Sequence, residues 1–278
     1  MPDIKKVPKV VSGVKVVHWN PRRHHLPRPL GRVRFGARVN NFGDLLGPVI
    51  VERLCQQRGY VTREGSSRLV TVGSIMHAVR DGDVVWGTGV NGKTRPELTD
   101  VRNAQFEAVR GPLTRQFMIE RGHDVPEVFG DPAILVPDLF PEWNASSAKT
   151  RGLGFLPNLH DLPTWSNQVD DLISPHGHPA DVIPQIISCD RLVTSSLHGM
   201  IIADAYGIPV VLVKPVAEHE FKYLDYARGV RRAEPDFVDT LDRACEIVDE
   251  AQPAHIEAHV KADLLDAFPA GLWKCELA

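Results

Sequence analysis

Short β-branched runs alternate with longer amphipathic runs along this chain, and this alternation constrains its fold more than any other feature. Six runs have the length and composition of buried strands: Val10–His18 (interrupted by Gly13), Leu69–Val72, Val84–Trp86, Gly152–Leu156, Arg191–Thr194 and Val210–Val213. Six others have helical spacing: Asp44–Arg58, Pro112–Arg121, Ala180–Ser188, His198–Tyr206, Phe237–Glu250 and Ala254–Ala267. Strands and helices that follow one another with Gly-rich junctions predict an α/β fold with a mainly parallel sheet.

The strand–helix pattern runs twice through the 278 residues, a length that suits about two domains of roughly 150 residues. We expect one domain over residues 1–143 and a second over residues 151–278, joined by a polar linker at about 144–150. The C-terminal helix would be free to pack back on the first domain. Prolines at positions 21, 27 and 29 predict an irregular loop over residues 20–30.

Charge is unevenly distributed along the chain. The formal net charge of −3 argues against a general nucleic-acid binder. Residues 1–38 carry ten Lys or Arg side chains and one acid, a net charge of +9, and the remaining 240 residues carry −12. We expect either that cations such as Arg22, Arg23 and Arg28 contact an anionic membrane surface, or that acids of the folded protein pair with them.

The four cysteines are far apart in sequence, so the chain has no CxxC metal or redox pair. Cys55 and Cys189 lie in apolar stretches and are predicted to be small core residues. The N-terminal lysines precede no apolar signal-peptide core, and no apolar run approaches the ~18 residues of a membrane span. We therefore expect a cytoplasmic protein.

Glycine-containing junctions open the first long helix and end one predicted strand. In Asn40–Asp44, either Asn41 or Asp44 can cap the helix and Gly43 permits a tight turn. Amides at a helix N-terminus favour an anion, so this junction predicts either an anion-facing turn or an N-cap alone. After the predicted strand Val84–Trp86, the stretch from Gly87 to Gly92 has GxGxxG spacing, but no predicted helix opens from it, which favours packing glycines over a dinucleotide site.

Two further junctions carry side chains suited to chemistry. Arg110 precedes a helix that begins with Pro112, at the kind of strand end where open α/β sheets bind ligands. Its planar guanidinium matches a carboxylate or phosphate, or serves a salt bridge. After the strand Arg191–Thr194, Ser195 and Ser196 precede His198 at a helix start. Hydroxyls, helix amides and an imidazole at one place predict proton transfer near neutral pH, with a structural histidine as the alternative.

Signals for metal sites and for common hydrolase folds are weak. The pair His255 and His259 has i,i+4 spacing without the HExxH order, and the pairs at 24–25 and 176/178 lie in Pro/Gly-rich loops. The chain contains no GxSxG nucleophile elbow. We therefore expect no metal and no cofactor.

Five groups of motifs, in this order, resemble the polysaccharide pyruvyl transferase family. They are Asn41–Asp44, Gly73–Ser74 with Gly82–Gly89, Val109–Pro112, Gly130–Pro132, and Ser195–Gly199 with Ala203–Pro209. The resemblance implies two Rossmann-like domains facing a cleft, similar to the GT-B glycosyltransferases. It also implies transfer of a pyruvyl group from phosphoenolpyruvate to hydroxyls of an exopolysaccharide or cell-wall glycan precursor, with a cyclic ketal as product.

The resemblance also implies roles for individual residues. Arg110 would bind the carboxylate or phosphate of phosphoenolpyruvate, and His198 would act as general acid and base. A further cation is expected late in the second domain. Lys222 is the expected cation, with Lys214 as the alternative. The remaining residues predicted to contact the donor are Ser195, Ser196 and Leu197, and those expected on the acceptor side or shaping the cleft are Asn41, Gly43 and Asp44.

The chain departs from the family pattern at one position. Many members carry Arg-Leu-His where this chain has Ser196-Leu197-His198, so an expected anion-binding arginine is missing. The candidates to replace it are Arg191, Arg228, Arg231 and Arg232. Two other functions stay open at this level: a GT-B glycosyltransferase that uses a nucleotide-sugar, with Asp190 or Asp204 on the ribose, and a non-catalytic glycan-assembly partner.

Overall fold

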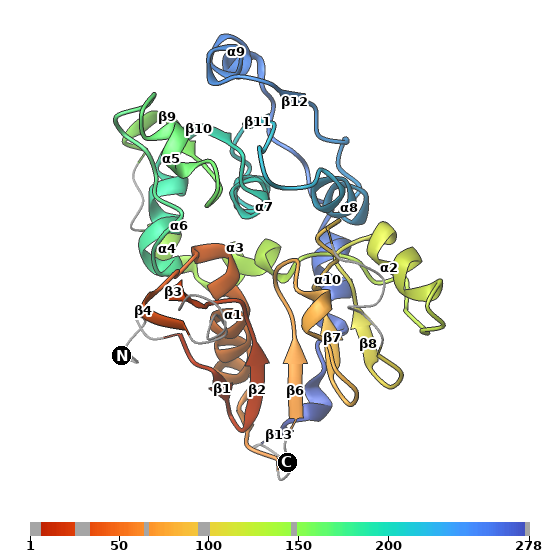
Figure 1. The fold of residues 1–278 in the computed structure, drawn as a ribbon. Helices are drawn as coiled ribbons and strands as arrows, with labels where there is room; N and C mark the ends of the chain where they lie inside the picture. The colour runs from red at the N-terminus through yellow and green to blue at the C-terminus, as the bar shows by residue number, and fades with distance from the viewer. Residues whose placement is uncertain (1–6, 26–33, 64–66, 94–100, 146–148, 276–278) are drawn as a thin grey trace.

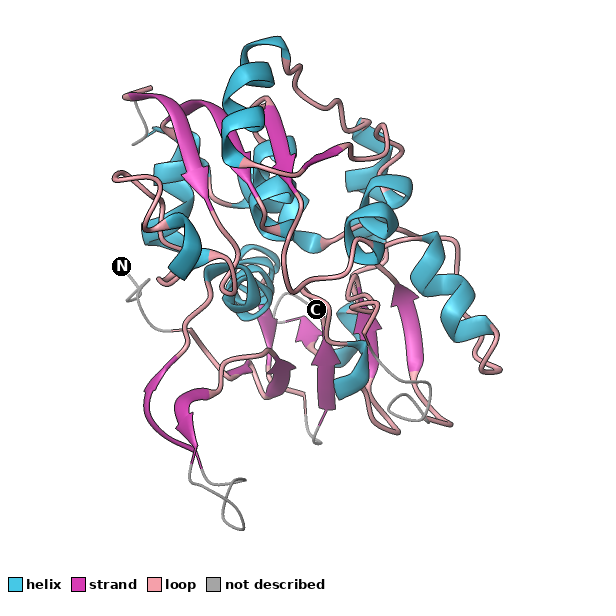
Figure 2. Ribbon diagram, turned by 45° about the horizontal axis from the view of Figure 1, so that its top comes forward, coloured by secondary structure: helices cyan, strands magenta, loops and turns pink. Residues whose placement is uncertain are grey.

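Two main β-sheets, one from each half of the chain, organise the fold of the computed structural model (Figure 1). The structure describes residues 7–25, 34–63, 67–93, 101–145 and 149–275. Helices lie between the sheets and around them (Figure 2). The mixed α/β class with parallel sheets that the sequence predicts is confirmed.

The helices largely follow the predicted amphipathic runs. In the described residues the α-helices are α1 (Phe42–Arg58), α2 (Pro112–Ile119), α3 (Val136–Leu139), α4 (Pro141–Ala145), α5 (Leu162–Trp165), α6 (Pro179–Ile187), α7 (Leu197–Ala205), α8 (Phe221–Gly229), α9 (Leu241–Ile247) and α10 (Ala258–Asp266). The 3-10 turns there are η1 (Met76–Ala78), η3 (Pro132–Leu135), η4 (Val248–Glu250) and η5 (Ala270–Leu272). The predicted start of α2 is confirmed, because Pro112 lies in its first turn after Gly111.

The first sheet has five strands in the order β1-β2-β6-β7-β8. Their bounds are β1 Val10–Val11, β2 Val14–Val17, β6 Ser67–Val70, β7 Val84–Trp86 and β8 Gln105–Ala108. The pairs from β2 to β8 are parallel and β1 is antiparallel to β2. The run Val10–His18, predicted as a strand interrupted by Gly13, forms two strands, because Ser12 and Gly13, both at positive φ, turn the chain into a hairpin.

The second sheet has four strands in the order β12-β11-β10-β9, all parallel. Their bounds are β9 Arg151–Leu156, β10 Cys189–Thr194, β11 Val210–Val213 and β12 Phe237–Val238. The prediction of a helix from Phe237 is wrong at its start, because Phe237 pairs with Leu212 of β11. The helix α9 begins four residues later, where the Thr240 hydroxyl accepts a hydrogen bond from the Arg243 amide.

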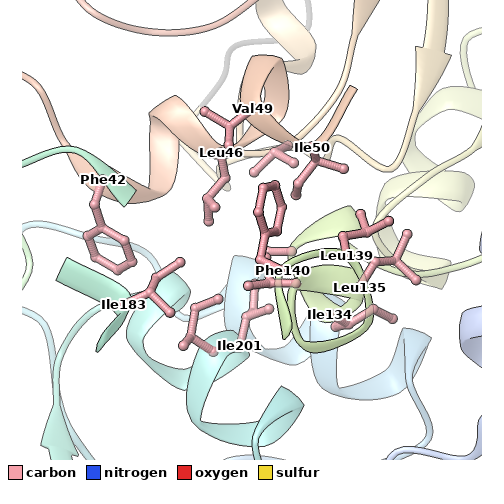
Figure 3. Close-up of a cluster of buried hydrophobic side chains, with 14 of the residues drawn as sticks. Phe42, Leu46, Val49, Ile50, Ile134, Leu135, Leu139, Phe140, Ile183 and Ile201 are labelled. Carbon is pink, nitrogen blue, oxygen red and sulfur yellow. The ribbon is translucent and has the colours of Figure 1, made fainter. Parts of the chain in front are cut away.

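Apolar side chains from both halves of the chain meet around α1 (Figure 3). The labelled residues are Phe42, Leu46, Val49 and Ile50 of α1, Ile134 and Leu135 of η3, Leu139 of α3, Phe140 directly after α3, Ile183 of α6 and Ile201 of α7. Burial of each such side chain stabilises the fold by about 1.5–3 kcal/mol. The N-terminus of α1 is thereby held against the second half of the chain.

The polar stretch predicted as a linker is partly helical. Residues 144 and 145 belong to α4, whose Trp143 is buried and stacks on Phe140 with ring centroids 4.2 Å apart. The Arg53 guanidinium of α1 pairs with the Glu142 carboxylate. Packing of Trp143 thus anchors a segment that its polar composition predicts to be exposed. The boundaries of the two domains stay predictions.

The prediction of an irregular loop over residues 20–30 is wrong for Arg22–His25, which form a strand. Strand β3 (Arg22–His25) pairs antiparallel with β4 (Arg34–Arg38). The Arg22 guanidinium donates to the Gly36 carbonyl at 2.7 Å, and the Arg23 Nε donates to the Arg38 carbonyl at 3.3 Å. Arg28 lies outside the described residues.

The C-terminal segment returns to the first sheet. Strand β13 (Lys274–Cys275) pairs with β5 (Tyr60–Val61). The Trp86 indole donates to the Leu264 carbonyl of α10 at 2.8 Å, and the Trp273 indole donates to the Val11 carbonyl at 3.1 Å. These long-range bonds fix the last helix on the N-terminal half.

The structure tests the predictions about the cysteines and about membrane-spanning helices. Cys55 and Cys189 are buried free thiols, so their prediction as core residues is confirmed. Within the part of the chain that the structure describes, no helix has both the length and the apolar character that crossing a membrane requires.

Candidate active site

A pocket of about 240 Å³ lies where the two halves of the chain meet. Its lining residues are Trp19, Asn41, Asp44, Ser74, Ile75, His77, Asn91 and Lys93 from the first half, and Asn158, Leu159, His160, Ser196, Leu197, His198, Glu218 and Lys222 from the second. Most of them lie in segments that follow the carboxyl ends of parallel strands of both sheets. Ligands of open α/β sheets bind outside such strand ends, so this pocket is the candidate active site.

His198 lies at the back of this pocket, in the first turn of α7. The Ser196 hydroxyl caps the helix by accepting a hydrogen bond from the Gly199 amide at 3.3 Å. Only 8% of His198 is exposed, and this burial, with the positive charges of Lys222 and Arg110, lowers its pKa to about 3. The imidazole is therefore neutral at pH 7 and can accept a proton.

Gly43 allows α1 to approach the His198 ring closely. A Cβ built at position 43 would stand 2.1 Å from the Nδ1 atom of His198, far inside van der Waals contact. The neighbouring Phe42 ring meets the imidazole edge-on, with centroids 6.4 Å apart. The glycine in the predicted turn thus serves packing against the histidine.

Gly43→Ala is expected to displace His198 and to lower kcat for the reaction of this site at least about tenfold, with about 1–3 kcal/mol lost from the free energy of unfolding through overpacking. Steady-state kinetics and urea unfolding measure the two effects. Gly152→Ala is the matched control, because a Cβ there meets no atom within 4 Å. Equal activity of the two variants would contradict this packing role.

A buried carboxylate faces the other nitrogen of His198. The Asp131 Oδ2 lies 3.9 Å from the His198 Nε2, and neither atom has a hydrogen-bond partner in the structure. The Asp131 Oδ1 accepts a hydrogen bond from the Ala133 amide at 3.0 Å, which fixes the carboxyl at the start of η3. Burial raises the pKa of Asp131 to about 6. Two buried polar atoms without partners this close together mark this histidine and this carboxyl as candidate functional groups.

Asp44 brings a second carboxyl with a raised pKa into the pocket. It is in the first turn of α1, whose N-cap is Asn41, as the sequence allowed: the Asn41 Oδ1 accepts from the Asp44 amide at 3.2 Å. Burial, only partly offset by the charge of Lys222, raises the pKa of Asp44 to about 7. Near neutral pH this side chain exchanges its proton readily.

Asp44→Asn is expected to stabilise the fold at pH 8 by about 2 kcal/mol, and to lose that gain at pH 5. A carboxyl with a raised folded-state pKa contributes stability below its unfolded pKa of about 4, and this stability is lost as pH rises through about 7. Asparagine removes the ionisation. Chemical denaturation at both pH values measures the difference, with Asp181→Asn on the exposed turn of α6 as control. A gain independent of pH would contradict the assignment.

Lys222 is the most buried cation of the pocket, and it lies in the first turn of α8. Its Nζ pairs with Glu218 at 3.0 Å, and Lys93 pairs with the same carboxylate at 3.1 Å. The Lys222 side chain is 12% exposed and that of Lys93 is 42% exposed. Burial lowers the pKa of Lys222, against the opposing effect of Glu218. Two lysines on one glutamate leave a positive charge available to an anionic ligand.

Arg110 lies behind the pocket and does not line it. It is fully buried, and its Nε donates to the Asp225 carboxylate of α8 at 3.0 Å. Its Nη1 donates to the hydroxyl of Ser74, a lining residue, at 2.6 Å. The Thr114 hydroxyl of α2 donates to the same Asp225 at 2.6 Å. These contacts position α8, and with it Lys222, while the grip of Arg110 on a donor stays a prediction.

A family model described as polysaccharide pyruvyl transferase matches residues 69–215, more than half of the chain. The chain belongs to the polysaccharide pyruvyl transferase family. It is 29% identical over 206 residues to succinoglycan biosynthesis protein ExoV of Rhizobium meliloti (strain 1021), an alignment that covers 68% of this chain and 61% of ExoV. It is 27% identical over 216 residues to the uncharacterized protein L143 of Acanthamoeba polyphaga mimivirus, covering 70% of each chain. This chain thus spans about three fifths of the length of ExoV.

The pyruvyl transferase match includes only part of the pocket. Residues Ser195 to His198 lie inside the matched segment, whereas Asp44 and Lys222 lie outside it. The predicted Ser195 is fully buried, where its hydroxyl accepts from the Asn158 amide at 3.0 Å and its carbonyl accepts from the Tyr223 hydroxyl at 2.6 Å. Ser195 therefore ties two segments of this family member together behind the lining residues.

None of the arginines considered as substitutes for the family's missing Arg lines the pocket. Arg191 pairs with Asp249, Arg228 with Glu234 and Arg232 with Asp204. Lys214, the alternative to Lys222, pairs with Glu220 on the surface. Arg231 also lies outside the lining. In this family member the lysines and arginines that do line the pocket are Lys222 and Lys93.

Several lining residues were not predicted from the sequence. Lys93, Glu218, His160 and Asn158 are held together by long-range contacts, such as His160 Nε2 to Glu218 at 3.4 Å. The role of Asp131 was also missed, although the motif Gly130–Pro132 marked the family. Their position in the sequence could have identified them, because each lies after the end of a strand or before a helix. His198 likewise follows the end of β10.

Proposed function

We propose that this protein transfers a pyruvyl group from phosphoenolpyruvate to sugar hydroxyls of an exopolysaccharide or cell-wall glycan precursor, forming a pyruvate ketal. The observation that carries the proposal is a buried neutral histidine beside a buried lysine at the strand ends of a pyruvyl transferase family member. The name of its relative, a succinoglycan biosynthesis protein, supports a polysaccharide acceptor.

Phosphoenolpyruvate suits the charge of the pocket. It is a small anion with a carboxylate and a phosphate, and both groups form charge-assisted hydrogen bonds with lysine. Lys222 and Lys93 supply the cations, and the amides at the start of α7 supply a positive helix end. Glu218 holds both lysines in place, so donor binding needs no rearrangement of α8.

The proposed reaction uses His198 to move protons. A sugar hydroxyl gives its proton to the neutral imidazole and its oxygen bonds to C2 of the donor, while the imidazole passes that proton on to the C3 methylene, which becomes a methyl group. A second hydroxyl then attacks C2, the bond to the phosphate oxygen breaks, and inorganic phosphate leaves with the second proton. Burial and, to a smaller extent, the charges of Lys222 and Arg110 depress the pKa of the imidazole, and the anionic donor opposes the effect of these charges. Asp44 and Asp131 are further proton carriers near neutral pH.

The proposal includes an architecture and a location. We propose a GT-B-like pair of Rossmann-like domains with the donor in the cleft between them. The equal share of lining residues from the two halves supports it. We also propose a cytoplasmic enzyme that lies at the inner membrane face, where its basic N-terminal segment would meet anionic lipid at about 1 kcal/mol per well-placed cation.

Thermal unfolding with a panel of donors tests the donor. Phosphoenolpyruvate is expected to raise the melting temperature of the wild type and to have a much smaller effect on Lys222→Met. Nucleotide-sugars are expected to have no effect on either. Stabilisation by a nucleotide-sugar and not by phosphoenolpyruvate would contradict the proposal and favour a glycosyltransferase. Stabilisation by neither donor would favour a non-catalytic assembly partner.

A further inference from the structure

A second concave site, of about 430 Å³, is lined by an unusual concentration of positive charge. Five cations line it: Lys9, Lys15, Arg38, Arg68 and Arg80. The same lining includes two histidines, at positions 18 and 77, and contains no acidic side chain. Cations held this close together repel one another unless an anion lies among them.

The nearby acid does not neutralise this site. Asp83 is buried and pairs with the Arg68 Nε at 3.3 Å, and its single negative charge, which also attracts Arg80 and Lys15, offsets one of the five positive charges. In the described part of the chain, the side chains of Lys15 and Arg80 have no ion-pair partner within 4 Å, and both are exposed to the site. Burial, and in addition the charges of Arg38 and Lys9, lower the pKa of His18. The site therefore has a net positive potential.

The cationic site adjoins the candidate active site. His77 lines both of them. Trp19, which is 40% exposed, lines the active pocket, and its neighbours His18 and Asn20 line the cationic site. A molecule that extends out of the active pocket past Trp19 and His77 would reach the cations next.

We propose that this site binds a phosphate or diphosphate group of the acceptor, while the sugar that receives the pyruvyl group lies in the active pocket. The inference rests on the proposed function for the identity of the acceptor. Lysine and arginine together suit phosphoryl oxygens, since arginine binds two oxygens at once and lysine acts as a point charge. Such a subsite would select phosphorylated precursors over the finished neutral glycan.

Calorimetric titration with inorganic pyrophosphate tests the site without requiring turnover, so its failure is distinct from failure of the proposed function. The double variant Lys15→Gln/Arg80→Gln is expected to weaken pyrophosphate binding roughly tenfold or more. Lys274→Gln, an exposed cation on β13, is the matched control and should bind as the wild type does. Absence of binding by the wild type, or binding that Lys222→Gln abolishes and the double variant retains, would overturn the proposal.

Kinetics then identify the source of the phosphoryl group. The double variant is expected to raise KM roughly tenfold for a glycan with a reducing-end diphosphate, and to leave KM for the free glycan and for phosphoenolpyruvate unchanged. An unchanged KM for the glycan diphosphate would overturn the acceptor assignment. Binding to anionic lipid vesicles that the double variant loses, with pyrophosphate affinity intact, would instead assign these cations to the membrane surface.

Discussion

His198→Ala is expected to lower kcat for pyruvyl transfer by about 10²–10⁴-fold, the usual contribution of general acid–base catalysis. The Nδ1 atom of the imidazole faces Gly43 of α1, and the Nε2 atom lies 3.9 Å from the Asp131 carboxyl. Removing it leaves the lysines in place, so KM for phosphoenolpyruvate should change little. Steady-state kinetics with circular dichroism as a check on folding measure both values.

Two further variants separate chemistry from packing in this experiment. His198→Asn fills much of the same volume with a neutral amide and should be as inactive as the alanine variant. His259→Ala removes an exposed histidine paired with Glu257 and should behave as the wild type. Recovery of turnover by the asparagine variant would show that position 198 acts through packing, and near-normal turnover of His198→Ala would refute its catalytic role.

Lys222→Met is expected to raise KM for phosphoenolpyruvate by about 10- to 100-fold, since hydrogen bonds to charged groups contribute about 1.5–3 kcal/mol. The methionine keeps the apolar length of the lysine and removes its charge. Glu218 would still pair with Lys93 and His160, so the variant leaves no isolated buried carboxylate. kcat should fall less than the affinity does.

Lys93→Met is the matched comparison for this prediction, because it removes a cation from the same glutamate. Its ammonium is far more exposed than that of Lys222, and water screens its interaction with an anion. We expect an increase in KM of only a few fold. A larger effect at Lys93 than at Lys222 would contradict the assignment of Lys222 as the principal donor cation.

The junction that carries His198 could be predicted from sequence almost residue by residue. A β-branched run, two serines and an apolar helix identify β10, the cap and α7, because each signal acts over a few neighbouring residues. At the start of α1 the sequence left Asn41 and Asp44 open as caps of a helix predicted from Asp44, and the structure begins the helix at Phe42 with Asn41 as its cap. Local capping chemistry and strand propensity were enough for the junction of His198 and narrowed the start of α1 to two residues.

The errors arose where long-range contacts decide the structure. The helix α8 was not predicted, because its buried face includes Asp225 and Gly229, residue types that are usually exposed. The Arg110 guanidinium binds Asp225 from 115 positions earlier in the chain, and the Arg110 carbonyl packs against Gly229. The short strand β12 was read as part of a helix because its partner β11 is 25 positions earlier in the chain. Periodicity contains no information about such partners.

The same reasoning explains the mixed result for the site. Lys222 was expected in the pocket on the strength of a family resemblance, and it lines the pocket. Arg110 was expected to face the donor, but a buried arginine at a strand end serves equally well to hold a helix through a carboxylate. Only the tertiary contacts separate these two uses of one residue.

The most direct test of the central claim is incubation of the full chain with phosphoenolpyruvate and candidate glycan acceptors, followed by mass spectrometry of the glycan and assay of released phosphate. The account predicts a pyruvyl addition to the glycan, one phosphate released for each ketal formed, and neither product with His198→Ala. Glycan products that form without consumption of phosphoenolpyruvate, or a ketal yield that His198→Ala leaves unchanged, would contradict it.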